Sequence, residues 1–123
     1  MAKQPENDSL QSYNVLGAGT LVKGTLETKG NLRIDGQFEG SMSVAGKLVV
    51  GKDSLVQGTI QCSSAELEGH VKVEKMTVSS LLSLKSTAVI EGVFNTQRLY
   101  VEQGALISGQ IQMPKDRNAQ PSK

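Results

Sequence analysis

The sequence predicts an all-β solenoid of about six turns, and three observations support this fold class. A short apolar-x-Gly pattern returns along the chain with a mean period of about 17 residues. Apolar and polar residues alternate within each copy, as they do in a strand with one buried face. Glycine is enriched, at 13 of 123 residues, while aromatic residues make up only 3%. This composition favours a thin core of small aliphatic side chains with tight corners between short strands.

The glycines mark the first register of the repeat. The pattern has five clean copies, whose glycines are Gly24, Gly40, Gly58, Gly92 and Gly109. The interval between Gly58 and Gly92 is wide enough for a sixth copy, and "HVKV" fits there with Val73 in the glycine position. The spacing varies somewhat from copy to copy, and it is shortest before Val73 and longest after it. Such a repeat indicates a coil in which each copy stacks on the next.

Two further apolar registers run in step with the glycines. One is a pair of apolar residues separated by one position, found at Leu32/Ile34, Leu48/Val50, Ala65/Leu67, Leu82/Leu84 and Leu99/Val101. The other follows the apolar residue of each copy at a fixed distance, at Leu26, Met42, Ile60, Lys75, Phe94 and Ile111. Only Lys75 breaks this register, in the same copy that lacks its glycine.

The individual elements are short. The apolar runs are brief and bounded by Gly, Ser, Asn or Lys, which predicts about three strands and three corners per turn. The segment "SSLLSLKSTAVI" comes nearest to a helical pattern, but its Ser, Thr and β-branched residues argue against a helix. A β-sandwich is the alternative, although it does not require side-chain registers that recur at a constant period. Left-handed hexapeptide helices need a strict hexapeptide period, and the variable spacing weakens that interpretation.

We expect one β-helix domain at residues 15–113, between disordered polar tails at residues 1–14 and 114–123. The first segment lacks a repeating apolar pattern, and the last carries two prolines and no large apolar side chain. The amino terminus has no apolar stretch typical of a signal peptide, and no run of about 18 apolar residues follows. The expected location is therefore the cytoplasm.

Charge and rare residues exclude several classes of function. Between Gly17 and Met113, nine Lys and Arg residues balance nine Asp and Glu residues without forming a basic stripe, so we expect no nucleic-acid partner. Cys62 and His70 are the single cysteine and the single histidine, and we expect a structural thiol and a surface imidazole. The "GAG" at residues 17–19 lacks the Gly-Lys-Ser/Thr of a phosphate loop. The sequence therefore predicts no catalytic, metal, cofactor or nucleotide site.

The ends of the predicted rod carry no obvious polar caps. At the amino-terminal end we expect exposed apolar residues at Leu21, Val22, Leu26, Leu32 and Ile34. At the carboxyl-terminal end we expect them at Phe94, Leu99, Val101, Leu106, Ile107 and Ile111. An unpaired strand edge templates further pairing, and an apolar cross-section gains from burial. The sequence therefore predicts two polymer interfaces, through which copies of the chain join end to end without nucleotide.

Several segments resemble the bactofilins, a family of bacterial cytoskeletal proteins. These are "VLGAGTLVKGTLETKGNLRIDGQFEGSM", "LVVGKDSLVQGTI" and "VIEGVF", of which "LRIDGQFEG" is the most specific part. The resemblance extends over roughly residues 15–113. It implies a right-handed triangular β-helix that polymerises without nucleotide into non-polar filaments, head to head and tail to tail. It also implies a scaffold for cell shape, cell-wall enzymes or polar positioning, often at the inner membrane.

The amino terminus departs from some members of that family. Those members have a short, strongly apolar peptide for membrane contact, whereas the chain here begins with polar residues, "MAKQPENDS". The candidates for membrane contact are therefore Leu10, Tyr13, Val15 and Leu16, and no basic cluster accompanies them. The alternative is that Val15 and Leu16 begin to cover the first turn.

Two other functions of solenoids are alternatives. A β-solenoid enzyme of the acyltransferase or polysaccharide-acting type needs strict hexads or a much longer chain with groove-forming insertions, and neither is present. Ice binding needs stacked Thr-x-Thr arrays, whereas the threonines here are scattered. We therefore expect a structural protein that is not an enzyme. Its main partner is itself, and the resemblance implies cell-wall or polarity proteins and the inner-membrane surface as further partners.

Overall fold

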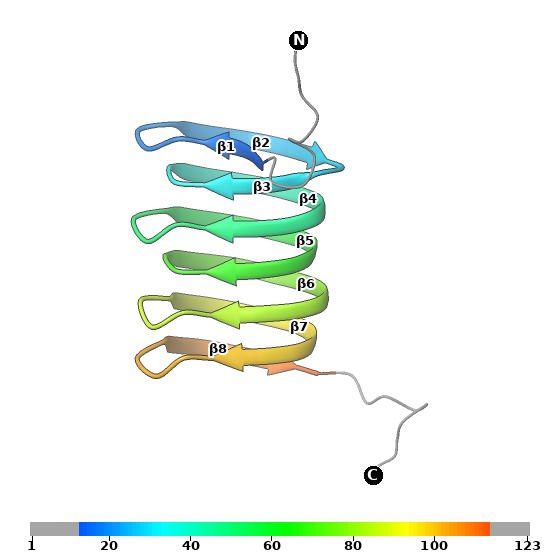
Figure 1. Ribbon diagram of the computed structural model, residues 1–123, viewed down its shortest axis with the longest axis vertical. Coiled ribbons are helices and arrows are strands. Elements are labelled where there is room, and N and C mark those ends of the chain that lie inside the picture. The colour runs from blue at the N-terminus through cyan, green and yellow to red at the C-terminus, as the bar shows by residue number, and fades with distance from the viewer. Residues whose placement is uncertain (1–12, 114–123) are drawn as a thin grey trace.

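The computed structural model describes residues 13–113, which form a single right-handed coil of parallel strands (Figure 1). No helix occurs among these residues, and the coil has about six turns, which confirms the predicted fold class. The coil is called the rod below. Its strands are β1 (Tyr13–Leu16), β2 (Leu21–Thr28), β3 (Asn31–Ile34), β4 (Gln37–Val50), β5 (Leu55–Leu67), β6 (His70–Leu84), β7 (Val89–Val101) and β8 (Leu106–Gln112).

The predicted tails lie outside the described residues, apart from the last two positions of the first tail. Tyr13 and Asn14, which the sequence assigned to that tail, belong to β1 and pair with Asn31 and Leu32 of β3. The first turn of the rod therefore begins at Tyr13, slightly before the predicted start of the domain.

Each turn is a triangle whose three sides stack into three faces of the rod. Face A consists of residues 21–23, 37–39, 55–57, 70–72, 89–91 and 106–108. Face B consists of residues 25–28, 41–44, 59–62, 75–78, 93–96 and 110–112. Face C consists of residues 13–16, 31–34, 47–50, 64–67, 81–84 and 98–101. Because each face contains one strand segment per turn, its inward side chains stack on one another from turn to turn.

Glycine forms the corner between faces A and B because the backbones of adjacent turns approach closely there. Gly58 has a φ of +122°, in the region that L side chains rarely adopt. A methyl group built at Gly58 would overlap the carbonyl oxygen of Gly40 in the preceding turn, and one at Gly92 would overlap the carbonyl oxygen of Val73. The recurring glycine of the sequence is therefore required by both its dihedral angle and its neighbour.

A bulge explains the copy that lacks glycine. Gly58 is paired with Val73, but the next pair is Thr59 with Lys75, so Glu74 is an extra residue at the corner. The shift also corrects the apparent break at Lys75. Met76 takes the inward position beside Ile60 and is 0% exposed, while the Lys75 side chain points outward.

The core is a single apolar column inside the rod. It contains the two phenylalanines, Phe38 and Phe94, together with Met42, Met76, Cys62 and aliphatic side chains from all three faces. Ser54 is buried at a corner, where its hydroxyl group donates a hydrogen bond of 2.6 Å to the carbonyl oxygen of Ile34. Because the core is continuous along the axis, every internal turn is covered on both sides, whereas residues 13–113 leave the cross-section open at the two ends.

Candidate polymerisation interface

Exposed large apolar side chains gather in the first and last turns of the rod. Within residues 13–113 they are Val15, Leu21, Tyr100, Val101, Leu106, Ile107 and Met113. Val15 and Leu21 belong to the first turn, and the others belong to the last turn or follow it directly. In the described part of the chain, none belongs to the turns between. Single exposed apolar residues are common on proteins, but their confinement to both ends is informative.

At the amino-terminal end, the inward apolar side chains of the first turn are Leu16, Val22 and Leu26. All three are half-buried and pack against the core on one side. Leu21 points outward and is 55% exposed. The first turn lies at the top of the rod in Figure 1, with the described residues below it. The upper surfaces of these three inward side chains are therefore left uncovered by residues 13–113.

Leu32 and Ile34 are not on that surface, although the sequence placed them there. They are 1% and 0% exposed, because β1 lies on β3 and sets Leu16 against Ile34. Leu16 therefore belongs to the first turn and covers Ile34 of the second, whereas Val15 points outward and is 56% exposed. Among the other predicted membrane contacts, Leu10 lies outside the described residues. Tyr13 belongs to β1, where its backbone pairs with Asn31.

At the carboxyl-terminal end, the predicted residues are on the surface with one exception. Ile107, Val101 and Leu106 are 43%, 41% and 63% exposed. Leu99 and Ile111 are half-buried against the core. Phe94 is the exception. It is 0% exposed, because it belongs to the turn before the last and is covered by its pairing partner Ile111.

Three residues at the ends, Leu16, Tyr100 and Met113, were not among the predicted interface residues, although the sequence offered Leu16 as a cover for the first turn. Leu16 precedes Ile34 by about one period of the repeat and pairs with it, so the spacing could have revealed it. The other inward position of that strand is occupied by Asn14, so the strand lacks the pair of apolar residues that marks this register in the other turns. Tyr100 and Met113 are 53% and 49% exposed at the last turn, and alternation alone predicts only that Tyr100 points outward.

The chemistry of the two ends favours association with another apolar surface. The inward side chains of both terminal turns are aliphatic, with Asn14 and Thr28 as polar exceptions at the amino-terminal end. Burial of about 300 Å² of apolar surface, counted over two partners, contributes roughly 7 kcal/mol before the cost of association. Within residues 13–113, no strand pairs with the outer edge of the first or the last turn, so these edges present backbone groups that another strand can satisfy.

The described residues contain little that could support chemistry. No group of three or more His, Cys, Asp or Glu residues among them could hold a metal ion. Cys62 is 4% exposed, and burial raises the pKa of its thiol to about 12, so the nucleophilic thiolate is scarce at neutral pH. The same part of the chain contains no helix with the length and apolarity needed to cross a bilayer.

Comparison with known proteins extends over nearly the whole rod. The family model described as "Bactofilin: Polymer-forming cytoskeletal" matches residues 14–112. The chain is also similar to Bactofilin BacO of Myxococcus xanthus (strain DK1622), with 24% identity over 105 residues, which cover 85% of this chain and 82% of the relative. No solved structure gives a significant match.

Proposed function

The chain belongs to the bactofilin family, and from this premise we propose that its rods join end to end, without nucleotide, into non-polar filaments. The family is one of polymer-forming cytoskeletal proteins. One observation supports the mode of assembly, namely that the exposed large apolar side chains of residues 13–113 are confined to the two ends. Joining two rods at their ends buries the inward apolar side chains of the terminal turns, such as Val22, Val101 and Ile107, and continues the strand ladder.

The filament is non-polar because each end of the rod binds the same end of another rod. Amino-terminal ends join head to head and carboxyl-terminal ends join tail to tail, so both junctions are isologous. This arrangement is supported by the apolar side chains at each end, against which a second copy of the same end can pack. At the amino-terminal junction Leu16, Val22 and Leu26 meet their own copies. At the carboxyl-terminal junction Val101 and Ile107 do the same.

The filament serves as a scaffold for cell shape, cell-wall enzymes or polar positioning, and the protein is not an enzyme. Membership of a structural family supports both statements. A peripheral contact with the inner membrane is the further role for the amino-terminal region. Val15 supports it, because this side chain is outward and 56% exposed, whereas Leu16 is used inside the rod.

Sedimentation of the purified chain tests the assembly. In buffer with EDTA and no nucleotide, we expect most of the protein at tens of micromolar to pellet at high centrifugal speed, and thin filaments to be visible by electron microscopy. Addition of ATP or GTP with magnesium should leave the pelleted fraction unchanged, because the rod needs no cofactor to bury its ends. A wild-type protein that stays monomeric under these conditions would contradict the proposal.

A further inference from the structure

Face B differs from the other two faces in its charge. Ten of its twelve outward side chains are uncharged, and nine of these are hydroxyl or amide groups, such as Ser43, Thr59 and Gln61. The two charged residues are Glu27 and Lys75, which have opposite signs and belong to different turns. Face B therefore has no net charge and presents mainly short polar side chains.

Faces A and C each carry four charged side chains, twice as many as face B, and the other charged residues of positions 17–113 lie at the corners. On face A, Lys23 lies 4.0 Å from Glu39. Along face C and its adjoining corner, a ladder of ion pairs joins successive turns. The Lys47 ammonium lies 2.9 Å from the Glu66 carboxylate, and the Lys85 ammonium lies 3.4 Å from Glu66 and 3.7 Å from Glu102. The hydrogen bond from Lys47 lowers the pKa of Glu66, so this carboxylate is charged at neutral pH.

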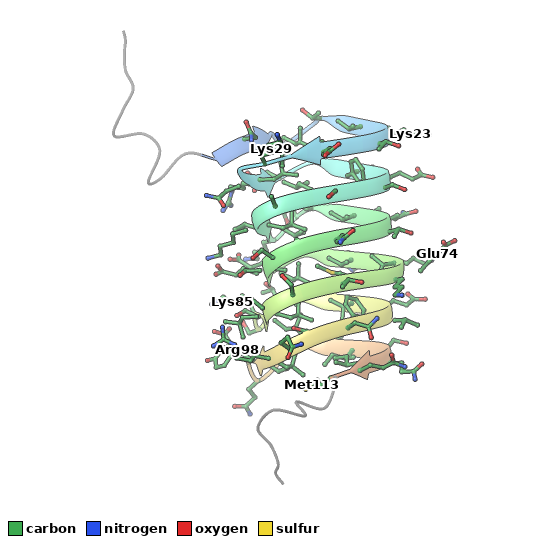
Figure 2. All side chains as sticks on the ribbon, turned by 90° about the vertical axis from the view of Figure 1, so that its right-hand side faces the viewer. Lys23, Lys29, Glu74, Lys85, Arg98 and Met113 are labelled. Carbon is green, nitrogen blue, oxygen red and sulfur yellow. The ribbon has the colours of Figure 1, made fainter. Side chains whose placement is uncertain are left out.

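Figure 2 looks onto face B and shows this division. The labelled charged side chains project to the two sides of the rod, with Lys23 and Glu74 at one edge and Lys85 and Arg98 at the other. A shallow hollow of about 550 Å³ opens at the carboxyl-terminal part of face B, beside Thr77, Asn95 and Gln112, and none of its lining residues is charged. Another surface can therefore approach face B without burying a charged group in most turns.

These properties make face B complementary to a copy of itself. Burying a charged group in an interface costs free energy unless it is well paired, and charged residues are depleted from interface centres. Hydroxyl and amide groups both donate and accept hydrogen bonds, so identical surfaces of this kind can satisfy each other across a two-fold axis. Faces A and C would instead have to rearrange their existing ion pairs.

We propose that face B is the lateral contact through which a filament of this protein binds a second filament of the same chain. This inference rests on the proposed end-to-end polymerisation, which repeats face B along the filament. The strand segments and turns of face B give it an area of about 13 by 29 Å, or roughly 380 Å² per rod and 760 Å² per pair. A stable interface between two proteins needs at least about 1,200 Å².

The area therefore couples lateral contact to polymerisation. Two isolated rods have too little contact to stay paired through face B. Two filaments of many rods make the same contact many times, and each contact raises the effective concentration for the next. Bundles should consequently appear only where filaments are present.

A matched pair of double variants tests the assignment. The variant Ser43→Lys with Thr59→Lys adds two positive charges to face B, and Gln37→Lys with Gln57→Lys adds the same charges to face A. Wild-type filaments should form bundles that pellet at low speed. The face B variant should lose at least tenfold in low-speed pellet while its high-speed pellet and circular dichroism spectrum stay unchanged. The face A variant should bundle like the wild type. Salt at about 0.5 M should restore bundling of the face B variant, because it screens the added repulsion.

Several outcomes would overturn the assignment. Bundles of the face B variant equal to those of the wild type would do so, as would an equal loss of bundles in both variants. Wild-type filaments that remain single would overturn it as well. Failure of end-to-end polymerisation is distinguished from loss of bundling, because it removes the high-speed pellet of the wild type. That result would overturn both proposals.

Discussion

Replacement of Gly58 by alanine is expected to lower the free energy of unfolding by more than about 3 kcal/mol, whereas Gly24→Ala should cost about 1–2 kcal/mol. The two glycines have nearly the same φ, +122° and +124°, so the backbone penalty is matched. They differ in their neighbours. A methyl group at Gly58 would overlap the Gly40 carbonyl oxygen, but one at Gly24 has no atom within 4 Å because no turn of the rod lies above it.

The difference between these variants isolates the cost of separating two turns. To admit the Gly58 methyl group, the rod must move two backbones apart and weaken the ladder hydrogen bonds between them. Urea denaturation of dilute protein, followed by circular dichroism, measures both free energies under conditions that disfavour filaments. Equal losses for the two variants would show that the glycine column is required only for its dihedral angle.

Charged substitutions at the two ends are expected to abolish filaments and to reveal their polarity. Val22→Arg and Ile107→Arg each place a guanidinium group in a junction that is otherwise aliphatic. An unpaired charge buried there costs about 3–5 kcal/mol, which weakens association by at least a hundredfold. In a non-polar filament each variant keeps one intact junction. We therefore expect dimers from either single variant and monomers from the double variant.

Light scattering coupled to gel filtration measures these masses directly. A polar, head-to-tail filament uses both ends in every junction, so either single variant would then be monomeric, and that result would contradict the non-polar arrangement. Leu55→Arg is the matched control, because Leu55 is a half-buried outward residue in the middle of face A and should leave filaments intact. Phe94→Arg is unsuitable as an end variant, since Phe94 is 0% exposed and the substitution would disrupt the core.

The repeat of the sequence was sufficient to predict the fold class because each register corresponds to a column of stacked side chains. The pairs Leu48/Val50, Ala65/Leu67 and Leu82/Leu84 are buried in two adjacent columns of face C, as alternation requires. The mean period also remained correct across the irregular copy. The position of the bulge could not be predicted from the repeat. The spacing is short before Val73 and long after it, so the mean period is the same wherever the extra residue is placed.

The extent of the candidate interfaces was harder to predict, because it depends on which turn is first. Asn14 occupies an inward position where other turns have an apolar residue, so "YNVL" did not match the repeat. In the structure its amide group donates hydrogen bonds of 3.1 Å to the Thr28 hydroxyl oxygen and 3.2 Å to the Asn31 carbonyl oxygen. These bonds satisfy the polar side chain at the end of the rod, and β1 then covers Leu32 and Ile34.

The axial repeat of the filament, measured by electron cryomicroscopy, is the most direct test of end-to-end joining. Six turns at about 4.8 Å give roughly 29 Å per rod, and a non-polar filament repeats after two rods, at roughly 58 Å. We expect strands perpendicular to the filament axis, with the spacing of about 4.8 Å continuing through the junctions. Filaments whose rods lie across the axis, or whose repeat is unrelated to the length of the rod, would contradict joining through the apolar ends.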